Sequence, residues 1–167
     1  CLPTWDDYEK LTVEDFGGVR TAYNNGKKAL AAIITNFLRY HIQDNSVFIG
    51  GKSVSNVKYE TSKINPANKR FFSLTVSADA NSLTMEDQLG NRRKVTMQSG
   101  LYNTIGREYW FQVSGSGASA VDQIYNASDV VVHQIDGPLF YEQSQLRPWR
   151  EVIGLSAAGA KSNHVKR

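Results

Sequence analysis

An amphipathic stretch over residues 27–40 constrains the fold of this chain more than any other feature. Its apolar residues recur at the spacing of a single helical face, namely Leu30, Ile33, Ile34, Phe37 and Leu38. A helix with such a face packs that face against a core. We therefore expect a helix that is entered through Asn24-Asn25-Gly26 and that stops near His41.

A shorter helix is expected in front of it. Thr4 is a good N-cap, and Asp7, three residues later, completes a capping-box pattern. One helical stripe with a spacing of three follows, formed by Trp5, Tyr8 and Leu11. Gly17-Gly18 then breaks the segment.

After His41 the pattern changes from helices to strands. Strands are expected within SVFIGGKSV (46–54), NKRFFSLTVSA (68–78), REYWFQV (107–113) and DVVVHQID (129–136). The segment NSLTMEDQLGNRRKVTM (81–97) alternates like a hairpin with its turn at Gly90-Asn91. Helices followed by a run of strands indicate an α+β fold, with helices packed on a mixed or antiparallel sheet.

Composition narrows the class of protein. The 167 residues are 41% hydrophobic and 21% charged, as in an ordinary globular domain. No stretch approaches the roughly 18 apolar residues that span a bilayer. The net charge is +3, and the basic residues are spread along the chain, with small clusters at residues 92–94 and in the last seven residues. This spread argues against nucleic acid as a partner.

The sequence offers few residues for catalysis or metal binding. Neither His41 nor His133 has a second histidine or cysteine at a ligand spacing, and no G-x-S-x-G, Walker or G-x-G-x-x-G motif occurs. His133 lies among valines on an expected strand, which is typical of a hydrogen-bonded core histidine. We therefore expect no enzyme activity, no metal, no cofactor and no catalytic residue.

Three segments, in the right order, resemble the fasciclin-like (FAS1) domain family. LPTWDDY (2–8) is similar to its Pro-Thr stretch, FLRYHI (37–42) to its Leu-x-Tyr-His segment, and DVVVHQIDGPLF (129–140) to its closing strand. The resemblance implies a FAS1-like α+β wedge or sandwich over residues 1–141. Residues 142–167 lose periodicity and are expected to form a C-terminal tail, with Trp149 and Val152-Ile153 docked on the domain. The chain departs from the family in three places: Asp129-Val130 replaces Asn-Gly, a long polar insertion lies between Lys52 and Arg70, and the family's opening helices and strand are missing.

By the same resemblance, the chain is a non-enzymatic module of the extracellular space or cell surface that binds protein or glycan in adhesion. In some family members the Tyr-His segment is proposed to contact a partner, which here means Tyr40 and His41. The residues themselves favour a structural role for this pair, with the two rings joining the helix to the closing strand near His133 or Asp136, and contact with a partner is the alternative. Candidate aromatic anchors for a partner are Tyr102, Tyr109, Trp110 and Trp149.

The single cysteine, Cys1, leaves the attachment of the chain open. It is the lipid-bearing residue of a bacterial lipoprotein, a cleavage remnant, or a strand residue of a chain that starts in mid-domain. Lipidation would favour a second function, that of an accessory lipoprotein subunit anchored in a bacterial outer-membrane assembly, such as a transporter or fibre complex. A third function, glycan hydrolysis, would require two carboxylates in one cleft, chosen from Asp79, Glu86, Asp87 and Asp136.

Overall fold

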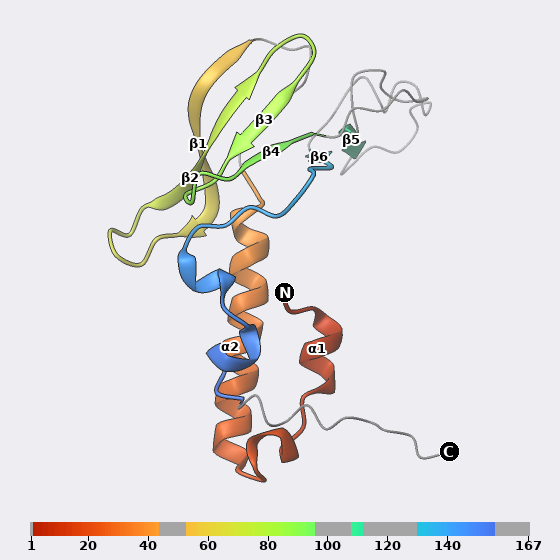
Figure 1. The fold of residues 1–167 in the computed structure, drawn as a ribbon, viewed down its shortest axis with the longest axis vertical. Coiled ribbons are helices and arrows are strands. Elements are labelled where there is room, and N and C mark those ends of the chain that lie inside the picture. The colour runs from red at the N-terminus through yellow and green to blue at the C-terminus, as the bar shows by residue number, and fades with distance from the viewer. Residues whose placement is uncertain (1, 44–52, 96–107, 112–129, 156–167) are drawn as a thin grey trace, which may run out of the picture. The chain divides into compact units, whose positions relative to one another are not determined.

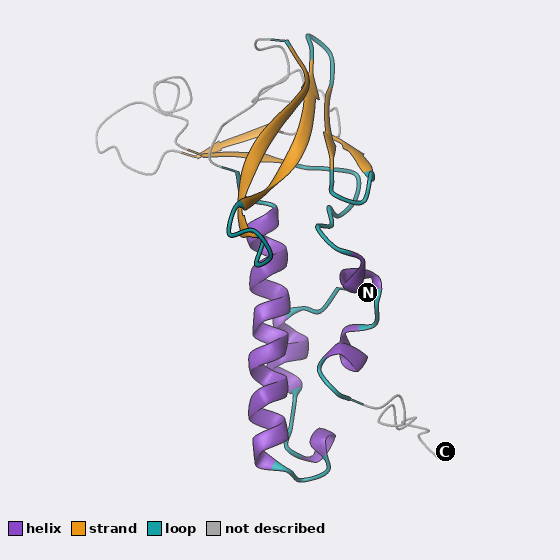
Figure 2. Cartoon of the chain, turned by 90° about the vertical axis from the view of Figure 1, so that its left-hand side faces the viewer, coloured by secondary structure: helices purple, strands orange, loops and turns teal. Residues whose placement is uncertain are grey.

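The computed structural model describes residues 2–43, 53–95, 108–111 and 130–155 (Figure 1). The chain divides into two compact units. Unit 1 comprises residues 1–39 and 142–167, and unit 2 comprises residues 40–141. Helices and a small antiparallel sheet are both present (Figure 2), so the predicted α+β class is confirmed. Whether residues 1–141 form one FAS1-like domain stays a prediction.

Unit 1 is helical. Its elements are α1 (Trp5–Lys10), the 3-10 turn η1 (Glu14–Phe16), α2 (Arg20–Tyr40, whose last residue belongs to unit 2), η2 (Gln143–Leu146) and α4 (Trp149–Val152). The predicted capping box is present, because the backbone N–H of Asp7 donates to Thr4 Oγ1 and that of Thr4 donates to Asp7 Oδ2. The backbone N–H and carboxylate of Asp15 make the same pair of bonds with Thr12.

The core of unit 1 draws on both ends of the chain. Its buried side chains, among the residues that the structure describes, are Leu11, Leu30, Ile34, Trp149, Ile153 and Leu155. Half of them come from residues 149–155, so the expected docking of Trp149 and Ile153 in the tail is confirmed. None of the helices in the described part of the chain combines the length and the apolar character needed to cross a membrane.

Helix α2 begins earlier than the sequence predicts. The helix runs through Asn24-Asn25-Gly26, which was expected to be its entry, and starts at Arg20. Gly26 is buried, and a Cβ atom at this position would overlap the ring of Phe16. The glycine is therefore a packing site for Phe16 within the helix, and the rule that reads Asn-Gly as a turn fails here.

Unit 2 contains a four-stranded antiparallel sheet in the order β1-β2-β3-β4. Its strands are β1 (Val54–Ile64), β2 (Phe71–Ala78), β3 (Leu83–Glu86) and β4 (Arg92–Lys94). The predicted hairpin of β3 and β4 is confirmed, with Gly90 in the left-handed region at φ +82°. A separate antiparallel pair joins β5 (Glu108–Phe111) to β6 (Val130–His133), and both segments were predicted as strands. The strand expected within residues 46–49 lies outside the described residues.

Strand β1 corrects the interpretation of residues 52–70 as a polar insertion. It is the longest strand in the described part of the chain, with 11 residues, and it pairs with β2. Its pairing shifts between Val54 and Val57 and again between Glu60 and Ile64, and Asn56 has φ +52°. Bulges of this kind break the period-two alternation by which a strand is recognised in a sequence.

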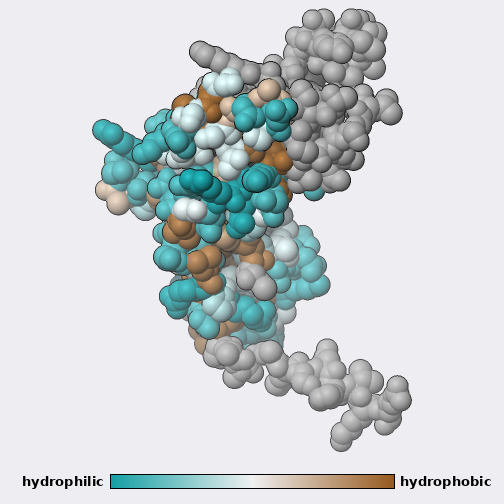
Figure 3. Space-filling view, turned by 45° about the horizontal axis from the view of Figure 1, so that its top comes forward, coloured by the Kyte–Doolittle hydropathy of each residue, from teal (hydrophilic) through white to brown (hydrophobic). Residues whose placement is uncertain are grey.

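One face of the sheet carries the core of unit 2. Leu74, Val76 and Ala78 of β2 alternate into it, together with Leu83 and Met85 of β3. The residues between them on β2 are Ser73, Thr75 and Ser77, so the opposite face is polar, as is usual for an antiparallel sheet with one solvated face. Hydrophilic residues also cover much of the described surface in the view of Figure 3, where hydrophobic residues form separate patches.

The packing of Gly26 leads to the first prediction. Replacing a glycine by alanine inside a helix ordinarily stabilises a protein by about 1 kcal/mol. We expect Gly26→Ala instead to lower the free energy of unfolding by about 1–3 kcal/mol, because the added methyl group overlaps the Phe16 ring. Urea unfolding measures the effect.

The control is the same substitution in a Phe16→Ala background, where the methyl group has room and Gly26→Ala should be stabilising. Asn25→Ala, at an exposed position of the same helix turn, should be neutral or stabilising in both backgrounds. Stabilisation by Gly26→Ala in the natural sequence would contradict the packing.

Candidate functional site

Tyr40, the candidate contact residue from FLRYHI, is completely buried. Its relative exposure is 0%, and its ring contacts the rings of Phe72 and Tyr141, with centroids 6.3 and 5.4 Å away. Its hydroxyl donates to the carbonyl of Ser73 at 3.3 Å and accepts from the backbone N–H of Gln88 at 3.2 Å. No partner can touch this ring in the structure as it stands.

His41 makes a backbone contact of long sequence separation. Its Nε2 accepts the N–H of Leu139 at 3.1 Å, across 98 residues. Leu139 is 1% exposed, so its N–H needs a partner inside the protein. An imidazole nitrogen can accept only when it carries no proton, so this hydrogen bond requires an unprotonated Nε2.

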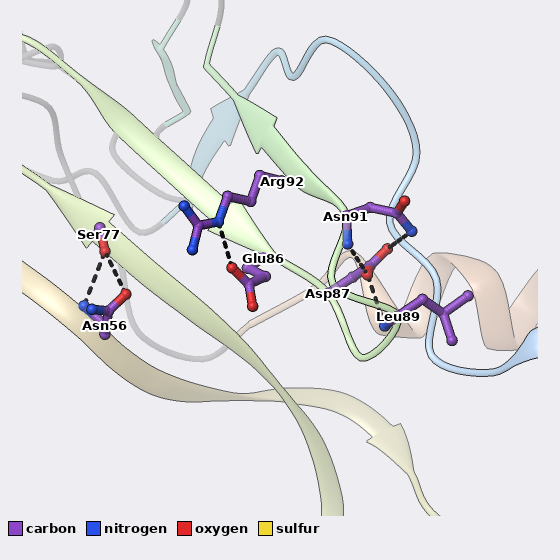
Figure 4. Close-up of polar contacts among 7 residues, drawn as sticks. All are labelled: Asn56, Ser77, Glu86, Asp87, Leu89, Asn91 and Arg92. Atoms are coloured by element: carbon purple, nitrogen blue, oxygen red, sulfur yellow. Dashed lines mark hydrogen bonds and ion pairs between the residues drawn. The ribbon is translucent and has the colours of Figure 1, made fainter.

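Asp87 holds the turn beside Tyr40. It is only 6% exposed, and its Oδ1 accepts the N–H groups of Leu89 and Asn91, both at 2.9 Å (Figure 4). Its Oδ2 accepts the side-chain amide of Asn91 at 2.9 Å and the N–H of Phe140 at 2.8 Å. The carboxylate therefore ties the β3–β4 turn to the segment that His41 also contacts. We name residues 133–141 the closing segment.

These residues form one polar cluster, which we name the Tyr40 joint and define as Tyr40, His41, Asp87, Gln88, Leu139 and Phe140. The N–H of Gln88 is shared between Tyr40 Oη and the carbonyl of Phe140, each at 3.2 Å, and its side-chain amide donates to the carbonyl of Ser73 at 2.7 Å. The cluster thus joins the start of unit 2 to its end with hydrogen bonds to backbone groups.

The electrostatics of the joint keep Tyr40 neutral. Burial is the main cause that raises the pKa of the Tyr40 phenol well above its usual 10.0, and the Asp87 carboxylate adds to this effect. The hydrogen bond from Gln88 acts in the opposite direction but is the weaker influence. Tyr40 is therefore present as a phenol that both donates and accepts, which suits a structural link.

Asp136 and His133, near which the pair was expected to join the closing strand, have contacts of their own with the strands. Asp136 is exposed, and it binds the edge of β4, accepting the N–H of Lys94 at 3.0 Å and donating its own N–H to the Lys94 carbonyl at 3.1 Å. His133 is half-buried at the end of β6, where it pairs with Glu108. Leu139 and Tyr141 of the same segment contact His41 and Tyr40 directly.

The carboxylates considered for hydrolysis have separate structural partners. Asp79 accepts the N–H groups of Asn81 and Ser82 in the β2–β3 turn, and these bonds are the main reason that its pKa is lowered. Glu86 pairs with Arg92 at 2.6 Å (Figure 4). Among the described residues, no three His, Cys, Asp or Glu side chains gather into a group that could hold a metal ion.

The aromatic anchors suggested by the sequence have mixed outcomes. The prediction that Trp149 is a surface anchor is wrong, because its side chain is buried in the core of unit 1. Cys1, Tyr102 and the side chains of Tyr109 and Trp110 lie outside what the structure describes.

The structure exposes a tryptophan that the sequence does not single out as a surface residue. Trp5 is 52% exposed and packs edge-on against Tyr8, with ring centroids 5.3 Å apart. Lys27 Nζ lies over the rings of Tyr8 and Tyr23, at 4.4 and 5.4 Å. We name Trp5, Tyr8, Tyr23 and Lys27 the aromatic patch of unit 1. The helical stripe gave no signal that Trp5 would face outward.

The Tyr40 joint leads to the second prediction. Tyr40→Phe removes a bond to Ser73 and half of a shared bond to Gln88, so we expect the free energy of unfolding to fall by about 1 kcal/mol at pH 7. Urea unfolding at several pH values measures this change. The control is Tyr59→Phe, which alters a half-buried tyrosine whose hydroxyl makes no hydrogen bond within the described residues.

The same variant should change the response to alkaline pH. The folded pKa of Tyr40 lies above its unfolded value of 10.0, so the stabilisation is complete below pH 10 and is lost as pH rises beyond it. The natural protein should lose up to about 1.4 kcal/mol per pH unit from this one group, and Tyr40→Phe should lack that contribution. Equal alkaline slopes in the two proteins would show that Tyr40 titrates as an exposed tyrosine.

Comparisons with protein-family models, with curated proteins and with solved structures found no match. The function is therefore argued from the residues and contacts described above.

Proposed function

We propose that this chain is a FAS1-like, non-enzymatic binding module that recognises protein or glycan at an extracellular surface, in the manner of an adhesion domain. One observation carries the proposal. Two of the three segments that resemble the family, FLRYHI and DVVVHQIDGPLF, meet in the Tyr40 joint through the bond from Leu139 to His41. Segments some hundred residues apart that resemble one family in order, and also contact each other, support a common fold more strongly than either segment alone.

In this proposal Tyr40 and His41 act as structural residues rather than as the contact with a partner. The burial of Tyr40 and the use of His41 Nε2 by the backbone support this role. The contact is then made by residues on the surface. Trp and Tyr are the residue types that most often dominate binding energy at interfaces, and the aromatic patch of unit 1 presents both beside a lysine.

The third prediction tests the proposal. The full chain is applied to an array of glycans and extracellular proteins, and any saturable ligand is then titrated against variants in solution. Trp5→Ser should weaken binding by about 10- to 100-fold, as expected for the loss of an interface tryptophan. Leu146→Ser removes an apolar side chain that is 55% exposed in the same unit and should leave binding unchanged.

The outcomes separate the two roles considered for Tyr40 and His41. Tyr40→Phe should bind normally at any temperature at which it is folded. A folded Tyr40→Phe that fails to bind, combined with normal binding by Trp5→Ser, would assign the contact to the Tyr-His pair instead. Conversion of a ligand into product would contradict the non-enzymatic proposal.

A further inference from the structure

The hairpin of β1 and β2 ends in a tip whose surface combines apolar and basic residues. We name residues 64–71 the hairpin tip. Ile64 and Phe71 pair across the two strands and are 49% and 46% exposed. Side chains of paired residues lie next to each other on one face of a hairpin, so these two form a small continuous apolar surface. Pro66 and Ala67, in the loop between them, are exposed as well.

Two cations lie directly beside this apolar surface. Lys69 and Arg70 are exposed and make no ion pair with any residue that the structure describes. No Asp or Glu occurs between Glu60 and Asp79, so the whole stretch from Thr61 to Ala78 is free of negative side chains. The tip therefore carries uncompensated positive charge.

The tip is held rigid by its own hydrogen bonds. Asn65 donates its N–H to the Arg70 carbonyl at 2.7 Å and accepts the N–H of Lys69 at 2.9 Å. Its side-chain oxygen accepts the N–H of Ala67 at 3.0 Å, and the side chain of Asn68 accepts that of Arg70 at 3.0 Å. Backbone groups that are already paired can approach a medium poor in water at little cost, and Pro66 has no N–H to lose.

We propose that the hairpin tip docks onto a lipid bilayer that carries anionic head groups. Exposed Ile and Phe side chains suit the boundary between head groups and acyl chains, while neighbouring Lys and Arg side chains suit the negative head groups above it. A soluble polyanion would explain the cations but not the exposed apolar pair. The inference does not depend on the recognition of protein or glycan, because it uses other residues.

The test is the partitioning of the full chain onto vesicles, measured by co-sedimentation. Phosphatidylcholine vesicles with 30% phosphatidylserine are compared with vesicles of phosphatidylcholine alone. We expect binding to the anionic vesicles only. The double variant Lys69→Gln with Arg70→Gln should bind about 30-fold more weakly, and Phe71→Ser should bind about 10-fold more weakly.

The control keeps the same net charge but leaves the tip intact. Lys28→Gln with Lys94→Gln removes one exposed cation from each unit, both outside the tip, and should retain most of the binding. As a direct probe, Phe71→Trp should add a blue-shifted emission that is quenched by brominated lipids in anionic vesicles. This measurement tests contact between residue 71 and the lipid even if the variant Phe71→Ser does not fold.

Three results would overturn the proposal. The first is no partitioning onto anionic vesicles by the natural chain. The second is an equal loss of binding in the tip and control charge variants, which would indicate general attraction of a basic protein. The third is binding to dextran sulfate that needs Lys69 and Arg70, together with unchanged vesicle binding by Phe71→Ser, which would assign the tip to a soluble polyanion.

Discussion

The structure of unit 2 depends on the contacts of the buried Tyr40 side chain. The chain enters this unit at Tyr40 and leaves it at Tyr141, and the two rings are in contact at 5.4 Å. Because the ring is fully buried, its hydroxyl must find partners inside the protein, and it finds them on β2 and on the turn after β3. The Asp87 carboxylate and His41 then fix the closing segment to the same place. A polar cluster of this kind specifies one arrangement of the chain, because each misplaced member would leave a buried group unsatisfied.

Local rules predicted those parts of the fold that local residues determine. The capping box at Thr4 and the hairpin turn at Gly90 needed only side chains within a few positions of each other. The start of β1 lies within a predicted strand segment, but its length was missed because its two register shifts break the alternation on which strand prediction relies. The start of α2 was predicted wrongly because Gly26 is needed for close packing against the Phe16 ring. A rule that treats glycine as a helix breaker takes no account of such a tertiary contact.

The candidate site shows the same division. That Tyr40 and His41 are structural could be anticipated from their place at the end of an apolar helix face. Their partners could not be, since Gln88 and Leu139 contribute backbone N–H groups, which carry no sequence signal. The exposure of Trp5 could not be predicted either, because its helical stripe with Tyr8 and Leu11 has the same spacing as a buried face. If Tyr40 and His41 serve the fold, a partner must be bound by surface residues. The aromatic patch and the hairpin tip are two such surfaces, and they differ in their chemistry.

Amide hydrogen exchange, read residue by residue by NMR, tests the central claim most directly. We expect the N–H groups of Gln88, Leu139 and Phe140 to exchange as slowly as those in the middle of β2. We also expect His41→Leu, which removes the acceptor of the Leu139 N–H, to speed exchange at Leu139 more than at the β2 amides. Fast exchange of these three amides in the natural protein, at the rate of an open loop, would contradict the Tyr40 joint and the structural role given to Tyr40 and His41.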